Sequence, residues 1–400
     1  MLILVANLGS TSFKYKLFDL APDSATPPRV LGSGSADRIG DAESAWQATV
    51  GEHADEGAAH LPDHAAAVQL HLDALQRFEA IRSISDIDAI GFKAVHGGPI
   101  SGAVVVDDDV LATMQRFADV APAHNPPYIA AMRAFRDMLP GVTQVAAFET
   151  GFHQSIPLAR QVYGIPHEWT EQLGIRRYGF HGASHRYIAT RLGELDPSAT
   201  RIINFHLGGS SSVCAIRDGR SVANSFGMSA QSGLFHNNRV GDFDVFALRK
   251  LMAAGHELPD ILTRLSKEGG WLGVSGVSAD VRDVQAAAAQ GNERAQLAVD
   301  AFTEGCRHYL GAYLVALGGA DAISFTGGIG QHDATLRAAV CDGLGFAGVR
   351  LDAAKNKKVT GKDEQRIDAA EGDVAVWVLP TNEELIVARQ TAEVLSHAAR

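Results

Sequence analysis

The sequence predicts an α/β protein with two domains that arose by internal duplication. Its 400 residues exceed the usual size of one domain, and 46% of them are apolar, which is enough for two full cores. Two hydroxyl-rich turns, at residues 7–12 and 206–212, each follow an apolar run and lie about half the chain length apart. Candidate strands and helices alternate in both halves, as is typical of α/β folds.

In the N-terminal half, residues 2–18 alternate around a turn and predict a β-hairpin. Residues 20–62 are rich in Pro, Ser, Asp and Gly, with weak strand signals only near 29–34 and 46–50, so we expect the least regular part of the fold there. Asp63 is a candidate N-cap for a helix that reaches about Ile81. We then expect a strand at 87–95, helices at 110–117 and 128–138, and a strand at 143–148.

In the C-terminal half, we expect a crossing between the halves at 148–155 and a helix near 186–192. Residues 202–216 predict a strand, a tight turn and a second strand, because apolar runs flank a Gly-Gly-Ser-Ser-Ser tract. Asp333 and Asn382 are candidate N-caps, the second of a final helix with two glutamates in its first turn. The other expected elements are helices at 245–253 and 292–317, strands at 322–325 and 374–379, and a glycine-rich turn at 326–330.

The composition argues against several classes of protein. A net charge of −11 disfavours nucleic acid or an anionic membrane as the main partner. No apolar run is long enough to span a bilayer, and the first residues lack the charged start of a signal peptide. The three cysteines, Cys214, Cys306 and Cys341, show no CxxC spacing, so we expect reduced thiols and a cytoplasmic protein.

Several common signatures are absent from the sequence, namely the P-loop, the dinucleotide GxGxxG, the GxSxG elbow and HExxH. Phosphate binding would therefore depend on the two hydroxyl-rich turns. Such turns suit phosphate because glycine allows a close approach to the backbone, and hydroxyl and N–H groups donate hydrogen bonds. An ordinary hairpin with a polar turn fits each stretch as well.

Four cationic or titratable side chains each allow two interpretations. Lys14 is either a solvated strand residue or a counter-charge for phosphate beside its turn. Lys93 lies inside an apolar strand, where an ammonium group needs a partner or a ligand. His181 lies between glycines in an aromatic loop and Arg239 follows two asparagines, and each could be structural or functional.

Taken together, these segments resemble the motifs of acetate kinases, in the same order, from residue 2 to about 392. The matching segments are Asn7-x-Gly-Ser-x-Ser-x-Lys14, His96-Gly-Gly, Phe152-His153-Gln154, Tyr178-Gly-Phe-His-Gly-x-Ser-His185, His206-Leu-Gly, Arg239-x-Gly-Asp242, Ser278-x-Asp-x-Arg-Asp283, Phe325-Thr-x-Gly-Ile-Gly330 and Pro380-Thr-Asn-Glu-Glu-Leu385. The resemblance implies two duplicated actin/Hsp70-like (ribonuclease H-like) domains around a nucleotide cleft. It places an acyl and phosphate-side domain at 1–150 plus 383–400, and a nucleotide-binding and dimerisation domain of a homodimer at 151–382.

The resemblance also implies an activity: reversible phosphoryl transfer from ATP to acetate, or to a slightly larger acid such as propionate, giving acyl phosphate and ADP with Mg²⁺. It implies catalytic roles for Glu149, His181 and Arg239, and Mg²⁺ ligation by Asn7 and Glu383, with Glu384 as the alternative. The implied acyl contacts are Lys93, Val95, Ala123, Phe180 and Ala230. The implied nucleotide and phosphate contacts are Ser10, Ser12, Lys14, His206, Leu207, Gly208, Gly209, Ser210, Asp280, Val281, Arg282, Gly328, Ile329, Gly330, Gln331 and His332.

Some of these positions depart from the family pattern. Lys93 stands where the family has arginine, so the charge is kept but the bidentate fork of arginine is lost. Glu149 stands where the family has aspartate. Gly209-Ser210 replaces Asn-Gly in the phosphate loop, and Gln331-His332 replaces Glu-Asn in the adenosine loop. These changes motivate two alternatives: a catalytically weak nucleotide-binding regulator on the same fold, or a kinase that uses pyrophosphate.

Two further departures concern the acyl pocket. Ala123 replaces a leucine and Ala230 replaces a proline, so we expect room for one or two more carbons on the substrate. The opposing interpretation is that a neighbour such as Phe226 or Met228 fills the space.

Overall fold

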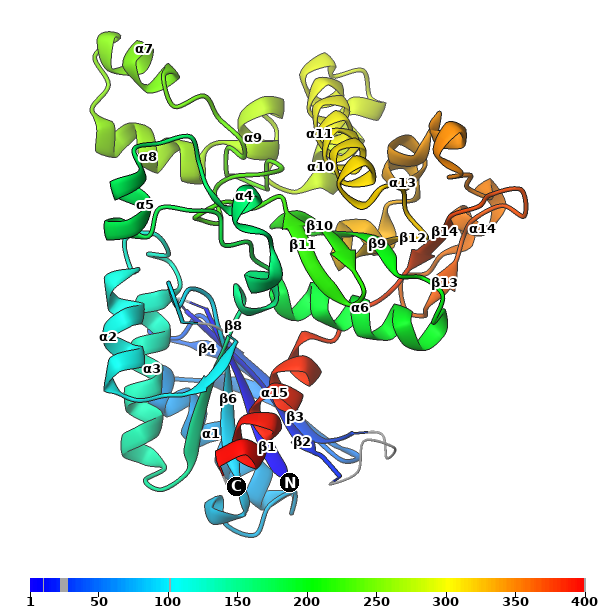
Figure 1. Ribbon diagram of the computed structural model, residues 1–400. Helices are drawn as coiled ribbons and strands as arrows, with labels where there is room; N and C mark the ends of the chain where they lie inside the picture. The colour runs from blue at the N-terminus through cyan, green and yellow to red at the C-terminus, as the bar shows by residue number, and fades with distance from the viewer. Residues whose placement is uncertain (10, 22–27, 101, 399–400) are drawn as a thin grey trace. The chain divides into compact units, whose positions relative to one another are not determined.

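The computed structural model describes residues 1–9, 11–21, 28–100 and 102–398, and it divides into two compact units (Figure 1). Unit 1 comprises Met1–Gln154 and Asn382–Arg400, and unit 2 comprises Ser155–Thr381. Each unit has a mixed β-sheet of its own with helices packed on it. The predicted α/β class is therefore confirmed.

The sheet of unit 1 is organised around its central strand, β1 (Leu2–Leu8). β1 pairs antiparallel with β2 (Ser12–Asp19), which confirms the predicted hairpin, and parallel with β6 (Ala89–Ala94). β6 pairs parallel with β8 (Thr143–Phe148), which is followed in the sheet by the short β7 (Ala103–Val105). Because the three parallel strands end at one edge of the sheet, the residues at their ends are brought together there.

Residues 28–62 are more regular than the sequence indicated. Three strands, β3 (Arg29–Asp37), β4 (Ser44–Val50) and β5 (His53–Ala59), extend the sheet from β2 as an antiparallel meander. The sequence indicated irregular structure because glycine has a low β-propensity. The prediction was wrong because hydrogen bonding to a neighbouring strand determines the conformation here. At Gly34, for example, an added Cβ would lie 2.6 Å from the Tyr15 ring, so packing requires glycine.

Helices cover both faces of this sheet (Figure 1). On one face, Leu4, Ala6 and Leu8 of β1 share a core with α1 (His64–Arg77), α2 (Asp108–Arg116) and α3 (Asn125–Met138). On the other face, Ile3 and Val5 pack with α15 (Glu383–Ala398). This alternation follows from the two-residue period of a strand.

The predicted N-caps of unit 1 are confirmed. Asp63 accepts a hydrogen bond from the N–H of Ala66 (2.9 Å), and Asn382 accepts one from the N–H of Leu385 (3.2 Å). α1 ends at Arg77 and not near Ile81, because Phe78 is its C-cap and Glu79 then adopts a left-handed backbone (φ 60°).

Unit 2 repeats the strand arrangement of unit 1. β9 (Arg201–Leu207) pairs antiparallel with β10 (Ser211–Arg217) and parallel with β12 (Ala322–Thr326), and β12 pairs parallel with β14 (Ala375–Val378). The order β11-β10-β9-β12-β14, with β11 at Arg220–Asn224, therefore matches β3-β2-β1-β6-β8 strand for strand. This match confirms the duplication. The short β13 (Gln365–Arg366) completes the sheet.

In unit 2, α6 (Gly182–Leu195) covers one face of the sheet and α11 (Glu293–Leu317) covers the other (Figure 1). The predicted cap Asp333 of α13 (Ala334–Cys341) is confirmed, and the expected helix at 292–317 is α11, with Asn292 as its N-cap. The remaining helices are α4 (Leu158–Gln161), α5 (His167–Leu173), α7 (Ala247–Ala253), α8 (Leu258–Lys267), α9 (Gly270–Ser275), α10 (Val281–Ala289) and α14 (Ala353–Lys358). The 3₁₀ turns are η1 (Ile84–Asp86), η2 (Gly151–Ser155) and η3 (Leu344–Ala347).

The glycine-rich segment after β12 differs from the prediction. It forms a short helix, α12 (Gly327–His332), and not the expected turn at 326–330. Gly327 has φ 76°, and an added Cβ there would lie 2.5 Å from the carbonyl oxygen of Leu207. Glycine at this position therefore lets the chain pass close to β9 and begin the helix at once.

The three cysteines are buried and free. Burial raises the pKa of Cys214 and of Cys341 to about 12, so neither is a thiolate at neutral pH. Among the helices of the described ranges, none combines the length and the apolar character needed to cross a membrane.

His71 on α1 is an unusual polar group in the core of unit 1. It is 2% exposed, its ring centroid lies 4.9 Å from that of Tyr15, and neither ring nitrogen has a hydrogen-bond partner within the described part of the chain. Burial lowers the pKa of His71 to about 4. Because the unfolded chain takes up this proton near pH 6.5, the free energy of unfolding should fall as the pH drops from about 6.5 to about 4.

Between pH 7 and pH 4.5, we expect the free energy of unfolding of unit 1 to fall by about 2 kcal/mol less in His71→Leu than in the native protein, since one pKa unit corresponds to about 1.4 kcal/mol. Urea unfolding at both pH values measures the difference. His60→Leu, at an exposed position of unit 1, is the matched control and should leave the loss unchanged. A parallel loss of stability in His71→Leu and the native protein would show that His71 does not gain its proton on unfolding.

Candidate functional site

Unit 1 holds a largely buried ammonium between two carboxylates, near the edge where β6 and β8 end. Lys93 on β6 forms an ion pair with Glu383, the first residue of α15, and its Nζ lies 3.7 Å from Oε1 of Glu149. The N–H of Glu149 donates to the carbonyl of Ala94 (2.8 Å), which holds Glu149 beside the end of β6. Burial alone would lower the pKa of Lys93, but the charges of Glu383 and Glu149 outweigh it and raise that pKa. Lys93 therefore has the partners that its apolar strand requires.

A tyrosine positions Asn7 near the end of β1. The hydroxyl of Tyr128, in the first turn of α3, donates to Oδ1 of Asn7 (3.2 Å) and accepts from the N–H of Leu8 (3.1 Å). Burial raises the pKa of Tyr128 to about 12, so the hydroxyl stays protonated and can donate. Tyr128 was not among the residues predicted from the sequence, because its partners are distant in the chain and only its place in the first turn of a helix could have indicated it.

The two glutamates at the start of α15 have different partners. Glu383 pairs with Lys93, whereas Glu384 lies 3.4 Å from Nζ of Lys16 on β2. The side chains of Lys16 and Glu384 are partly exposed. Glu383 is therefore the glutamate that belongs to the Lys93 cluster.

The hydroxyl-rich turn of unit 1 is tight. The N–H of Gly9 donates to the carbonyl of Ser12 (2.9 Å), and an added Cβ at Gly9 would lie 2.4 Å from Oγ of Ser12. Lys14, on β2, is exposed, whereas Ser10 lies outside the described residues. Of the acyl-contact candidates in this unit, Val95 is half-buried and Ala123 is exposed.

In unit 2, a chain of hydrogen bonds holds His181. His181 precedes α6 and has a left-handed backbone (φ 58°, ψ 34°). Its Nδ1 lies 2.8 Å from Oγ of Ser212, which lies 2.8 Å from Nε2 of His185. Asn204 donates to Nδ1 of His185 (2.8 Å) and accepts from the hydroxyl of Ser324 (2.8 Å). The imidazole is therefore tied to three strands of the sheet. His185 and Ser212 lie in segments that the sequence had indicated, whereas Asn204 and Ser324 were not among the predicted residues.

Aromatic side chains surround His181. The ring centroid of His206, on β9, lies 4.1 Å from that of His181, and its Nδ1 lies 2.8 Å from Oγ of Ser184. Phe180 is buried against Phe226, with ring centroids 5.5 Å apart. Phe226 also packs against His181 at 5.2 Å, so its ring is held by several neighbours.

Arg239 and Ala230 lie next to each other. Nη1 of Arg239 donates to the carbonyl of Ala230 (2.5 Å). Burial lowers the pKa of Arg239 to about 10, which still leaves the guanidinium charged at neutral pH. A cavity of about 580 Å³ is lined by their neighbours in the chain, among them Ser229, Gln231 and residues 240–244, but not by Arg239 or Ala230 themselves. Arg239 is thus a partly buried positive charge in a segment whose adjoining residues line an open space.

The turn between β9 and β10 offers hydrogen-bond donors. The N–H of Gly208 donates to Oγ of Ser211 (3.3 Å), and the N–H of Ser211 donates to Nδ1 of His236 (3.0 Å). The N–H groups of Gly209 and Ser210 have no hydrogen-bond partner in the described ranges. Leu207, by contrast, is fully buried in the core. The turn is therefore held at its base and leaves two N–H groups for an anion.

The adenosine candidates lie on two segments that meet. Asp280 is the N-cap of α10 and pairs with the exposed Arg282 (2.5 Å), while Val281 is half-buried. Gln285 on α10 donates to Asp333 (2.5 Å), the residue that follows α12. This bond brings α10 close to the end of the helix that carries Gly328, Ile329, Gly330, Gln331 and His332.

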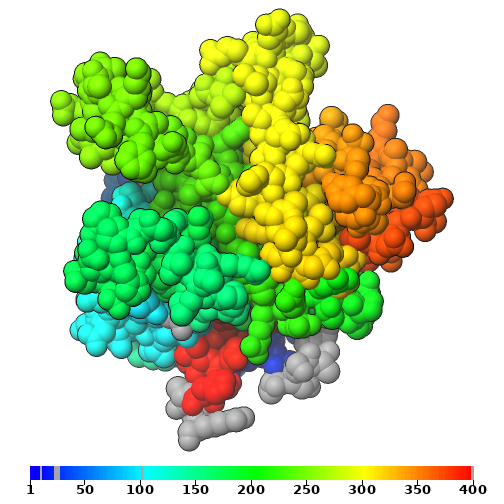
Figure 2. Space-filling model, turned by 45° about the horizontal axis from the view of Figure 1, so that its top comes forward, coloured from blue at the N-terminus to red at the C-terminus, as the bar shows by residue number. Residues whose placement is uncertain are grey.

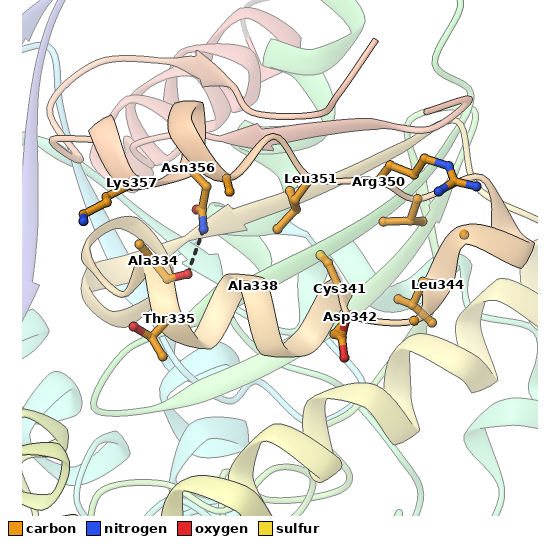
Figure 3. A pocket seen from close by; sticks show the side chains of 14 residues that line it. Ala334, Thr335, Ala338, Cys341, Asp342, Leu344, Arg350, Leu351, Asn356 and Lys357 are labelled. Carbon is orange, nitrogen blue, oxygen red and sulfur yellow. Dashed lines mark hydrogen bonds between the residues drawn. The ribbon is translucent and has the colours of Figure 1, made fainter. Parts of the chain in front are cut away.

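Another cavity, of about 680 Å³, lies between α13 and α14 (Figure 3). Cys341, Leu344, Arg350 and Lys357 line it among others. In Figure 3, Asn356 donates across it to the carbonyl of Ala334 (2.8 Å). None of the site residues expected from the sequence lines this cavity.

The two units therefore offer opposite charges. In unit 1, two carboxylates and one ammonium leave a net charge of −1 beside an amide oxygen, a combination that suits a hard cation. In unit 2, a guanidinium, an imidazole and backbone N–H groups suit an anion. Within the described ranges, no three His, Cys, Asp or Glu side chains form a group that could hold a metal, so a cation would need ligands from substrate or water.

Comparisons with known proteins agree with this chemistry. The model of the Acetokinase family matches residues 2–389. The chain is 41% identical to an acetate kinase of Desulfitobacterium hafniense, over 99% of each chain, and 41% identical to a propionate kinase of Citrobacter rodentium, over 98% of this chain and 96% of that one. The structure is similar to that of Porphyromonas gingivalis acetate kinase, with a TM-score of 0.88, 36% identity and coverage of 98% of this chain and 99% of the other.

We expect Lys93→Met to destabilise unit 1 by about 3 kcal/mol, because removing one partner of a buried ion pair leaves uncompensated charge. Lys16→Met is the matched control: it breaks the partly exposed pair with Glu384 and should cost less than about 1 kcal/mol. Urea unfolding at pH 7 compares the two variants. Equal losses of stability would mean that Glu149 and Glu383 do not need the ammonium.

Proposed function

This chain belongs to the acetokinase family, and from that premise we propose how its residues act. It is an ATP-dependent carboxylate kinase. A carboxylate oxygen attacks the γ-phosphorus of ATP, the bond to the bridging oxygen of the β-phosphate breaks, and acyl phosphate and ADP leave. The observation that carries this function is the nearly full-length identity of 41% to relatives named acetate kinase and propionate kinase.

Unit 2 would supply the phosphoryl-donor side of the reaction. His181 and Arg239 would stabilise the charge on the oxygens of the phosphoryl group in transit, because such transfer depends on positioning and electrostatics and needs little covalent chemistry. The hydrogen-bond chain behind His181 and the charged state of Arg239 support this role. The turn at 206–210 would hold nucleotide phosphates, and residues 280–282 and 328–332 would hold adenosine.

Unit 1 would supply the acceptor side. Lys93 would face the carboxylate of the substrate and Glu149 would act beside it, which is supported by their separation of 3.7 Å. Ser10, Ser12 and Lys14 would line the phosphate path. Val95 and Ala123 would contact the acyl group, and Phe180 and Ala230, which belong to unit 2, are proposed for the same role. A carboxylate is already a competent nucleophile at neutral pH, so the reaction needs no strong general base.

Asn7 and Glu383 would hold Mg²⁺. Magnesium is bound in proteins by one or two carboxylates together with substrate phosphates and water, and the amide oxygen and the net charge of −1 in this cluster fit that requirement. When bound, Mg²⁺ would neutralise charge on the phosphates of the nucleotide. Tyr128 would keep Oδ1 of Asn7 in place, and the pairing of Glu384 with Lys16 supports Glu383 as the ligand.

We also propose a homodimer through unit 2 and a cytoplasmic location. Figure 2 shows residues near 250 as a separate lobe, on which Val245 and Phe246 are 63% and 71% exposed and Met252 and Leu262 are also exposed. Such apolar exposure on one segment is typical of an interaction surface. Three buried free cysteines fit a reducing compartment. Sedimentation equilibrium giving the mass of one chain would contradict the dimer.

A chain-length series of carboxylates, with ATP and Mg²⁺ and hydroxylamine trapping of acyl phosphate, tests the function and the acyl pocket together. We expect kcat/KM for propionate or butyrate to equal or exceed that for acetate, because each buried CH₂ contributes about 0.8 kcal/mol. Ala123→Leu is the matched variant and should shift the preference back to acetate. ATP binding without any acyl phosphate would overturn the function, whereas acetate leading propionate tenfold or more would overturn only the larger pocket.

We expect His181→Ala and Arg239→Ala each to lower kcat about 10²–10³-fold with a much smaller change in KM, because both side chains would act on the transition state. Steady-state kinetics at saturating ATP measure the effect. Arg282→Ala provides the contrast, since loss of an adenosine contact should raise the KM for ATP and leave kcat unchanged. A His181 or Arg239 variant with native kcat and a raised KM would remove that residue from the proposed role.

A further inference from the structure

The side chain of Asn237 fills the space that a side chain at Gly209 would need. An ideal Cβ built on Gly209 would lie 3.1 Å from Nδ2 of Asn237, 3.6 Å from its Cγ and 3.8 Å from its Oδ1. The backbone of Gly209 is outside the left-handed region, so its conformation would accept other residues. The Asn237 amide therefore restricts residue 209 by the space that it occupies, whereas the backbone conformation imposes no restriction.

The backbone of Asn237 is fixed on both sides, which holds its side chain against the turn. Its N–H donates to the carbonyl of Gly209 (3.1 Å), and its carbonyl accepts from the N–H of Leu272 (3.0 Å). Its side-chain amide, in contrast, makes no hydrogen bond to the described residues, and Asn237 is only half-buried. An anchored residue with an unused amide next to a polar turn is in position to bind a ligand.

The surroundings of this amide favour an anion. The unpaired N–H groups of Gly209 and Ser210 are in the same turn, and Arg239 follows two residues later in the segment that carries Asn237. The atom nearest the Gly209 Cβ position is the donor Nδ2, not the acceptor Oδ1. The described geometry thus presents a donor to the turn.

We propose that the carboxamide of Asn237 completes the phosphate-binding turn at 208–210 and donates a hydrogen bond to a phosphate oxygen of the bound nucleotide. This inference rests on the proposed function. It makes Asn237 a nucleotide-binding residue, and it gives a reason for glycine at position 209, since a side chain there would push the Asn237 amide aside by a few tenths of an ångström. A carboxamide at residue 209 would then be able to donate the same hydrogen bond to phosphate if residue 237 were small.

Calorimetric binding of ATP, ADP and adenosine, at constant Mg²⁺, tests the proposal. Asn237→Ala should weaken ATP and ADP about tenfold, since a hydrogen bond to a charged group is usually worth about 1.5 kcal/mol or more, and should leave adenosine unchanged. Asn237→Asp should weaken the phosphorylated ligands further by repulsion. Asn238→Ala, which changes the neighbouring asparagine, is the matched control and should bind all three ligands as the native protein does.

A swap separates phosphate binding from folding. Gly209→Asn alone should weaken ATP, because its side chain meets the amide of Asn237, and Gly209→Asn combined with Asn237→Ala should recover binding to within about threefold of the native protein. Native affinity for ATP in Asn237→Ala, or an equal loss for adenosine, would overturn the inference while leaving the proposed function intact. A native protein that binds neither ATP nor ADP would overturn both.

Discussion

Parallel pairing of three strands in each unit is the constraint on which both candidate sites depend. β1, β6 and β8 all end at one edge of their sheet, and this common edge brings Asn7, Lys93 and Glu149 to the same side although the chain separates them widely. In unit 2, β9 and β12 end together in the same way, so the turn at 208–210 lies beside Gly327. The duplication repeated the edge, and each copy then acquired a different set of side chains, one anionic and one cationic.

Local signals in the sequence predicted the skeleton of the fold, and non-local contacts account for what they missed. Hairpins and N-caps such as Asp63 and Asp333 depend on a few neighbouring residues, so the sequence carries enough information to identify them. The strands at 29–59 were underestimated because their stability comes from a ladder begun by β2. In the site, the charged and aromatic candidates were visible as motifs, whereas Tyr128 and Asn204 were not, because nothing near them in the chain indicates which distant side chains they contact.

The substitution of lysine for the expected arginine at position 93 changes how unit 1 manages its charge. A lysine ammonium is a point charge that can serve two carboxylates from one atom, and Nζ does so for Glu383 and Glu149. An arginine would present a planar fork that favours one carboxylate in a bidentate geometry. The longer side chain of Glu149 fits this arrangement, since it must reach toward a single nitrogen. Through its single Nζ atom, Lys93 therefore links its strand to the loop that carries Glu149 and to the first turn of α15.

At His181 the backbone conformation is unfavourable for a residue with a side chain, whereas the contacts of the ring are favourable. A side chain with φ near 58° costs about 1 kcal/mol relative to glycine, which tolerates that conformation freely. Glycine would relieve that backbone cost, but it would lose the hydrogen bond to Ser212 and the packing against His206 and Phe226. The contacts of the ring therefore offset the strain of the backbone, and a side chain without a ring nitrogen at this position would keep the strain and lose the hydrogen bond. His181 is consequently a residue whose backbone conformation and side-chain contacts must be retained together among related sequences.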